Sequence, residues 1–266
     1  MGIYSQVGNG KTALLLDDLS ASTNFGWSAF QLSESQTLCI QIIRASDSAT
    51  LDIGFVSGYI DTAAITTFAS GTTYKIVTFY NAIGYNNATD TLDSRRETGI
   101  LTGGVDSKFS IDDSGDTYNN LHYALDTTIT DTQASEYISV VKKPSVSGNG
   151  YGFCASVQIY GRLSYNSTGL RYRDASGTKS QTGLFTTNGE YLARIRRDSS
   201  DDILMGVDGT ETNTGSKSTL MNMTHLRGSR SSSNFESLLL QFPSTLSSDD
   251  WTKIKTWYNL NFNKSI

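Results

Sequence analysis

The sequence is poor in proline, cysteine and histidine, with two of each among its 266 residues. Cys39 and Cys154 lie in separate apolar segments, and two isolated cysteines form no disulfide framework. We therefore expect buried free thiols, with a single disulfide as the alternative. His122 and His225 show neither of the short spacings that mark a zinc site. The spacing of the residues does not exclude a Ser-His-Asp triad, but the sequence contains no GxSxG elbow. We predict no catalytic residue and no metal site from these residue types.

Charge and long apolar runs are also scarce. Charged residues make up 18% of the chain and the net charge is −5, so no basic field is available for a phosphate backbone. No apolar run approaches the roughly 20 residues of a membrane span. The N-terminus MGIYSQVGNGKTALLLDD has only a short apolar core, whereas a signal peptide needs a longer one and a small-residue cleavage site. We expect no nucleic acid, no membrane and no standard export.

The residues that are abundant favour an all-β protein. Glycine occurs 24 times and aromatic residues make up 11%, alongside many Ser, Thr and Asn residues, which suits short strands joined by tight turns. Strand-like patterns occur at residues 38–44, 74–80, 153–160, 191–197, 203–207 and 236–242. Asp208-Gly209 predicts a type I′ hairpin turn. Residues 81–120 are polar and rich in turn residues, which predicts either a long loop or a set of short edge strands.

Two helices are expected. Asp61 can cap a short helix near residues 61–68. At the C-terminus, Ser247 or Ser248 can cap a second helix, whose first turn carries two aspartates that suit the helix dipole. Its aromatic and aliphatic residues recur at helical spacing: Trp251, Ile254, Trp257 and Tyr258. We expect this helix to close the sandwich.

Several motifs suggest chemistry but lack its full pattern. GNGKT at residues 8–12 lacks the first glycine and the preceding strand of a phosphate-binding loop. The cluster Asp112, Asp113 and Asp116 misses the ligand alternation of an EF-hand, so an exposed turn is expected, although calcium held by distant loops stays open as a cofactor. Glu236 could belong to a glycosidase carboxylate pair, but a solvated or salt-bridged structural glutamate is the favoured interpretation.

Aromatic residues near Asn and Gly give a second kind of candidate. Sugar rings stack on aromatic faces flanked by polar hydrogen-bonding groups. The tyrosines at strand ends or in loops are Tyr80, Tyr85, Tyr151, Tyr160, Tyr165 and Tyr172. Among them, with the neighbouring amide, we predict Tyr80, Tyr85 and Asn87 as carbohydrate-binding residues, against the alternative of ordinary strand packing. The glycosylation patterns at Asn87, Asn166 and Asn222 are read as chance matches.

The stretch from 28 to 89 resembles the start of the arabinofuranosidase B catalytic domain, and more closely a shortened relative found in phage structural proteins. The family pattern runs R-x-S-D, D-I-G, D-x-A-A-x-x-x-F and W-Y-D-Q-S-G. The counterparts here are Arg44, Ser46, Asp47, Asp52, Ile53, Gly54, Asp61, Ala63, Ala64, Phe68, Phe79 and Tyr80. The ending from 235 to 262 resembles concanavalin A-like, laminin-G-like sandwiches. The resemblance implies a concanavalin A-like jelly roll of two antiparallel sheets, which agrees with the strand pattern.

The departures from this family bear on function. Asn81 and Ala82 stand where the family has Asp and Gln, and the segment carrying its catalytic glutamate has no counterpart, so no catalytic residue is carried over. We therefore interpret Asp47 and Asp52 as turn-ordering residues, with Arg44 pairing one of them, and Asp61 as a helix cap.

The sequence thus leads to one main hypothesis and two alternatives. The main one is a non-enzymatic bacteriophage virion protein, a head or tail fibre, decoration or adhesin-like component that binds glycans. It would be made in the host cytoplasm and displayed as a homodimer or trimer among other virion proteins. Residues 1–22 would form an arm or first strand that docks on a partner, and 23–266 a single jelly roll. The alternatives are a glycoside hydrolase of arabinofuranosidase type acting on surface polysaccharide, and a lectin-like module of a cell-surface protein.

Overall fold

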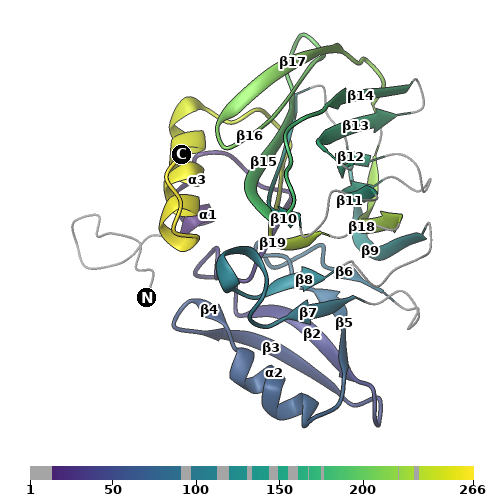
Figure 1. The fold of residues 1–266 in the computed structure, drawn as a ribbon, viewed down its shortest axis with the longest axis vertical. Helices are drawn as coiled ribbons and strands as arrows, with labels where there is room; N and C mark the ends of the chain where they lie inside the picture. The colour runs from purple at the N-terminus through teal and green to yellow at the C-terminus, as the bar shows by residue number, and fades with distance from the viewer. Residues whose placement is uncertain are drawn as a thin grey trace.

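The computed structural model describes residues 14–90, 97–112, 120–130, 134–143, 149–154, 161–166, 168–174, 177–220, 222–230 and 234–266. Within these ranges two antiparallel sheets pack face to face (Figure 1). None of the described helices combines the length and apolar character that a bilayer crossing requires. The all-β prediction of a jelly-roll sandwich with two antiparallel sheets is confirmed.

The smaller sheet has eight strands among the described residues, and β19 is at its centre. Its neighbours are β10 on one side and both β8 and β1 on the other. The strands are β17 (Thr210–Ser216), β16 (Asp202–Val207), β15 (Gly189–Arg197), β10 (Ser135–Lys143), β19 (Phe235–Phe242), β8 (Ser110–Asp112), β7 (Thr98–Ile100) and β1 (Phe25–Ser28).

The larger sheet has eleven strands in the described part of the chain. In spatial order they are β14 (Gly177–Gln181), β13 (Leu170–Asp174), β12 (Gly161–Tyr165), β11 (Asn149–Cys154), β18 (Met223–Arg230), β9 (Asn120–Ile129), β6 (Ala88–Thr89), β5 (Tyr74–Phe79), β2 (Leu38–Arg44), β3 (Thr50–Val56) and β4 (Tyr59–Ile60). The predicted strand at 153–160 is confirmed only to Cys154, because 155–160 lie outside the described residues. Of the short strands found between 81 and 120, β6 lies inside the sheet rather than at its edge, since it pairs with both β5 and β9.

The main core lies between the two sheets. Trp27, Ile40 and Phe79 meet Tyr137 and Leu239 there, all fully buried. The ring of Trp27 packs edge-on against Phe79, with 5.2 Å between centroids. Alternating side chains from both sheets therefore supply one continuous apolar layer.

A second core lies on the opposite face of the smaller sheet, beneath α3 (Ser248–Asn261). Ile254, Trp257 and Tyr258 of α3 pack there against strand residues that include Ile138 and Leu240. Figure 1 shows α3 and the short α1 (Leu15–Asp18) together on this side of the sheet. The predicted closing helix is confirmed, and its aromatic stripe is the reason it docks.

The helix caps follow the sequence. In α2 (Thr62–Ala69), the Asp61 carboxylate accepts from the Ala64 amide at 2.9 Å. In α3, Ser247 rather than Ser248 is the cap, and its hydroxyl accepts from the Asp250 amide at 3.1 Å. The type I′ prediction for Asp208-Gly209 is supported by the positive φ of both residues, 53° and 85°.

Residues 14–22, the described part of the predicted N-terminal arm, pack on the second core. Leu15 is fully buried there. The Ser20 hydroxyl donates to Asp250 at 2.6 Å, and Lys253 donates to the Asp18 carbonyl at 2.6 Å. This part of the N-terminal segment therefore belongs to the packed body of the protein.

Candidate carbohydrate-binding face

Arg44 and Asp47 close the turn between β2 and β3. The guanidinium donates to both carboxylate oxygens, at 2.9 and 2.6 Å, and also to the Phe68 carbonyl of α2 at 2.8 Å. The hydrogen bonds from Arg44 hold the pKa of Asp47 at about 2, well below its usual range. The predicted structural role of this pair is confirmed, because every contact serves the turn or the neighbouring helix.

Asp52 differs from its prediction. It lies within β3 rather than in a turn, with its side chain exposed on the outer face of the larger sheet. Its Oδ1 accepts from Gln41 Nε2 at 2.8 Å and from the Tyr80 hydroxyl at 2.7 Å. The turn assignment was wrong because strand alternation runs through the D-I-G motif, which directs Ile53 into the core and Asp52 outward.

Asp52 is one end of a line of polar side chains that crosses four strands. Gln41 of β2 is directly opposite Asp52 on one side and Thr78 of β5 on the other. Thr78 pairs with Thr89 of β6, and their hydroxyls are 3.1 Å apart. We call Asp52, Gln41, Thr78 and Thr89 the polar row. Because the four positions share one register line, their side chains face the same side of the sheet.

Tyr80 lies beside the polar row. Partial desolvation raises the pKa of its phenol, and the hydrogen bond to the Asp52 carboxylate raises it further, so the hydroxyl stays a donor at neutral pH. Among the described residues, none donates to the second carboxylate oxygen of Asp52. The arrangement offers a ring face, an amide and an anionic acceptor to a ligand rich in hydroxyl groups.

The other two predicted carbohydrate-binding residues have different environments. Tyr85 is 64% exposed in the loop after β5. Asn87 has partners in the same region. Its Oδ1 accepts from the backbone N–H of Asn81 at 3.0 Å, and its own backbone N–H donates to the Asp126 carboxylate at 2.9 Å. No described contact joins Tyr85 or Asn87 to the polar row. The sequence prediction did not include Asp52, the partner of Tyr80, or Gln41, which also donates to Asp52. Strand alternation could have placed Asp52 on the outer face, but its partners depend on strand register.

Two of the remaining tyrosines are buried. Tyr165 and Tyr172 are fully enclosed between the sheets, and the Tyr165 hydroxyl donates to Ser139 at 2.6 Å. They serve packing, as the alternative interpretation had it. The side chains of Tyr151 and Tyr160 lie outside the described part of the structure.

The remaining candidates for chemistry are buried or cannot be placed. Glu236 is only 1% exposed, so the solvated half of its interpretation was wrong, and the salt-bridged half stays a prediction. Cys39 is a buried free thiol, as predicted, and burial raises its pKa far above the usual value. His225 Nδ1 lies 2.8 Å from the Thr224 hydroxyl. Outside the described residues lie GNGKT, Asp113, Asp116 and the side chains of His122 and Cys154.

A metal site is not evident in the described ranges. No group of three or more His, Cys, Asp or Glu side chains gathers there in a way that could hold an ion. The predicted cluster at 112–116 is only represented by Asp112, so the calcium alternative stays a prediction.

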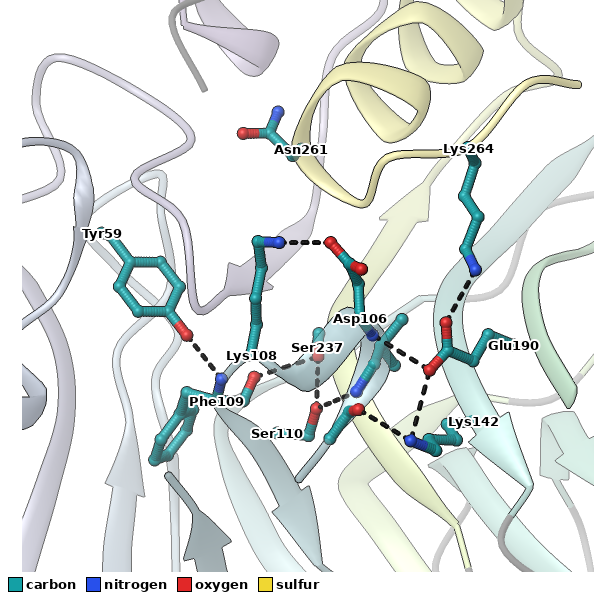
Figure 2. Close-up of polar contacts among 12 residues, drawn as sticks. Tyr59, Asp106, Lys108, Phe109, Ser110, Lys142, Glu190, Ser237, Asn261 and Lys264 are labelled. Carbon is teal, nitrogen blue, oxygen red and sulfur yellow. Dashed lines mark hydrogen bonds and ion pairs between the residues drawn. The ribbon is translucent and has the colours of Figure 1, made fainter. Parts of the chain in front are cut away.

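A half-buried ion network lies on the α3 side of the smaller sheet (Figure 2). Glu190 of β15 is its centre, with Lys264 at 2.7 Å, Lys142 at 3.3 Å and the Asp106 amide donating at 3.0 Å. Asp106 in turn pairs with Lys108. Burial alone would raise the pKa of Glu190, but the hydrogen bonds from Lys264, the Asp106 amide and Lys142 lower it overall.

The backbone at this network is unusual. Asp106 and Ser107 both have positive φ, 46° and 57°, in the short 3₁₀ turn Val105–Ser107. The Val105 amide donates to the Ser110 hydroxyl at 3.0 Å, and that hydroxyl is 2.6 Å from Ser237 on β19. Each charge in Figure 2 therefore has a partner within the network, which fastens the turn and the C-terminal residues to the sheet.

A second ion network is covered by α3. Glu136 accepts from Arg194 at 2.5 Å and from the Leu246 amide at 3.0 Å. The guanidinium of Arg194 stacks over Trp251 at 4.1 Å and also pairs with Glu211 at 3.4 Å. Since Glu136 is completely buried, this pair of carboxylates supports the packing of α3 rather than contact with a substrate.

Comparison with solved structures places the fold. The chain is similar to an arabinofuranosidase complexed with arabinofuranosyl-α-1,2-xylobiose (13% identity, TM-score 0.58, 91% of this chain and 63% of that one). It is also similar to a GH54 α-L-arabinofuranosidase soaked with a cyclic sulfate inhibitor (14% identity, TM-score 0.59, 95% and 65%). The chain thus spans less than two thirds of the length of these structures.

Two further comparisons gave no match, one against protein-family models and one against curated proteins. At 13–14% identity, the likeness to the arabinofuranosidases establishes a shared fold. The chain has the concanavalin A-like sandwich architecture that its sequence resemblance implied.

Proposed function

We propose that this chain is a non-enzymatic, glycan-binding jelly-roll domain whose ligand contacts Tyr80 and the polar row. The observation that carries the proposal is the exposed Asp52 carboxylate, held at one oxygen by Gln41 and Tyr80. A sugar hydroxyl can donate to the second oxygen while the sugar ring packs on the half-exposed tyrosine. The fold shared with arabinofuranosidases supports this ligand class.

The eroded family signature supports binding over hydrolysis. Where the arabinofuranosidase pattern has an aspartate after the tyrosine, this chain has Asn81, which is buried and accepts from the Gly26 amide at 2.9 Å. The residue thus anchors the loop to β1. Retaining and inverting glycosidases need two carboxyl groups about 5–10 Å apart on either side of the scissile bond. Hydrolysis of surface polysaccharide is the second candidate, on the strength of the shared fold.

The place of action belongs to the same proposal. The resemblance of residues 28–89 to phage structural proteins favours display on a virion, as a homodimer or trimer beside other virion proteins. Mass spectrometry of purified particles tests this location, and light scattering tests the oligomer. For docking, the informative deletion is 2–13, because removing Leu15 would also open the second core. Loss of incorporation with unchanged melting supports a docking role, and unchanged incorporation contradicts it.

A glycan array with four proteins tests the binding site. The wild type should bind a defined set of glycans, and Asp52→Ala should weaken that binding about tenfold or more, because a hydrogen bond to a charged group is lost. Tyr80→Phe should weaken it less. Asp47→Ala is the matched control, since it removes an exposed aspartate of the turn between β2 and β3 and no side chain of the polar row, and its binding should equal that of the wild type.

Two results would overturn the proposal. One is the absence of any glycan ligand for a folded wild type. The other is catalytic release of nitrophenol from an aryl arabinofuranoside by the purified, folded wild type, which would establish the hydrolase instead.

A further inference from the structure

Three polar side chains lie on the inner face of the smaller sheet, away from the proposed glycan site, and two of them are in contact. They are Lys143 at the end of β10, Asn234 just before β19, and Glu236 two residues later. Lys143 and Asn234 are fully buried and Glu236 is 1% exposed. A buried lysine is rare in proteins. The presence of an amide and a carboxyl group on the neighbouring strand makes this cluster a candidate for chemistry.

The strand register places the three groups on one face. Val141 lies opposite Glu236 and Lys142 opposite Phe235. Continuing the antiparallel register by one residue sets Lys143 opposite Asn234, with Glu236 as its diagonal neighbour. Long side chains at such diagonal positions are within reach of one another. Val141 belongs to the core between the sheets, so strand alternation directs Lys143, Asn234 and Glu236 to the same interior.

The amine and the amide are in contact. Lys143 Nζ lies 2.5 Å from Asn234 Oδ1. The amide carbon Cγ is one carbonyl bond, about 1.2 Å, from that oxygen. A small shift of the flexible lysine therefore brings Nζ to the roughly 3–3.5 Å from Cγ at which a nucleophile is poised to attack.

An aromatic cluster adjoins the contact through Phe185. The ring of Phe185 is 5.8 Å from Lys143 Nζ, and that ring packs against Tyr191 at 5.1 Å and Tyr165 at 6.3 Å. Phe185 is itself buried. The contact between Lys143 and Asn234 is therefore shielded from water.

We propose that Lys143 and Asn234 form an intramolecular isopeptide bond, with Glu236 as the proton carrier. The Nζ lone pair attacks Cγ of Asn234, and the Glu236 carboxyl group hydrogen-bonds the carbonyl oxygen as charge develops on it. A proton passes from Nζ through Glu236 to the amide nitrogen. The Cγ–Nδ2 bond breaks and one ammonia leaves. No oxidant, cofactor or water is consumed, and Glu236 ends in its starting state.

Such a bond would join two central strands of the smaller sheet, β10 and β19, which lie side by side in Figure 1. It would close a covalent loop of about 90 residues, and loops of that length give large stabilisation when cross-linked. The proposal does not depend on glycan binding.

Intact-mass spectrometry of the folded full chain tests the proposal. The expected mass is that of the sequence less one ammonia, and peptide mapping should recover the Lys143 peptide joined to the Asn234 peptide. Lys143→Met, Asn234→Ala and Glu236→Gln should each have the full mass of their sequence. The matched control is Lys142→Met, which removes the adjacent lysine of the opposite face and should retain the loss.

The wild type alone decides the outcome even if a variant does not fold. Full sequence mass in the folded wild type would overturn the proposal and leave a buried hydrogen bond between lysine and amide. Loss of ammonia that maps to another asparagine, or that persists in Lys143→Met, would also overturn it. In boiling detergent, the cross-linked wild type should migrate faster than Glu236→Gln, because the closed loop keeps the denatured chain more compact.

Discussion

At the scale of single residues, the polar groups divide by what they contact. Asp47 and Asp61 serve a turn and a helix start, as their sequence context predicts. Asp52 contacts the side chains of two other strands instead. The first two could be predicted because a turn or a cap is formed by residues close in sequence. The partners of Asp52 depend on strand register, which the local pattern does not contain.

The Asp47 carboxylate offers a direct check of the turn. Its pKa is held at about 2 by the hydrogen bonds from Arg44. In Arg44→Gln the pKa should rise toward the ordinary aspartate value of about 3.9. Because the folded pKa is lowered, the contribution of this pair is present at neutral pH and is lost as the pH falls toward 2.

Carbon-detected NMR titration of the side-chain carboxylates measures this shift. Asp52 is an internal reference, since it lies on the same sheet and has no contact with Arg44. An unchanged Asp47 pKa in the variant would show that the guanidinium does not hold the turn in solution.

At the scale of elements, α3 shows what sequence periodicity can and cannot give. The spacing of Ile254, Trp257 and Tyr258 predicts a helix and its apolar face. The surface that receives this face is the outer side of the smaller sheet, built by residues such as Val140, Leu192 and Leu240. Strands that are buried on both faces have continuous apolar runs. The sequence of such a run does not show which of its residues face α3 and which face the other sheet.

Trp257→Ala should destabilise the protein by about 3–5 kcal/mol, the range for truncating a large aromatic side chain in a core. Trp257 is 2% exposed and packs against Phe30 and Phe262, so the cavity has no easy way to close. Equilibrium denaturation in urea gives the free energy of unfolding. Thr252→Ala, on the exposed face of α3, is the control and should change stability by less than about 0.5 kcal/mol. Equal effects of the two substitutions would contradict the docking described for α3.

At the scale of the whole molecule, contacts between distant segments close the structure. Ser20 binds Asp250, and Lys264 binds Glu190. Composition and alternation were enough to predict an all-β protein, several of its strands and both larger helices, and the family resemblance implied the sandwich. The central strands β9, β10 and β18 were not predicted. Composition and alternation could not predict the two cores or the ion network of Figure 2, because these depend on residues brought together from segments far apart in the chain.

Acid should weaken the interactions of Glu190 with Lys264 and of Asp250 with Ser20, and so lower the stability of the fold. The pKa values of Glu190 and Asp250 are both lowered in the folded protein, since hydrogen bonds from Lys264 and Ser20 respectively outweigh burial. A lowered folded pKa means that the contribution is present above the unfolded values of about 4 and is lost as the pH falls through the folded ones.

Melting temperatures measured from pH 7 down to pH 3 test this behaviour. The wild type should lose stability as the pH falls below about 4. Glu190→Gln should start lower at pH 7 and lose less over the same range, because one of the titrating groups is gone. A variant whose pH profile parallels that of the wild type would show that Glu190 contributes nothing to the acid response.

The central claim is that the outer face of the larger sheet binds a glycan through Tyr80 and the polar row. The most direct measurement is amide NMR of the isotope-labelled protein during titration with its best glycan from the array. We predict that the shifts concentrate at Gln41, Asp52 and Tyr80 and fade in Asp52→Ala. Shifts confined to the α3 side of the smaller sheet, or a glycan that binds Asp52→Ala as tightly as the wild type, would contradict the claim.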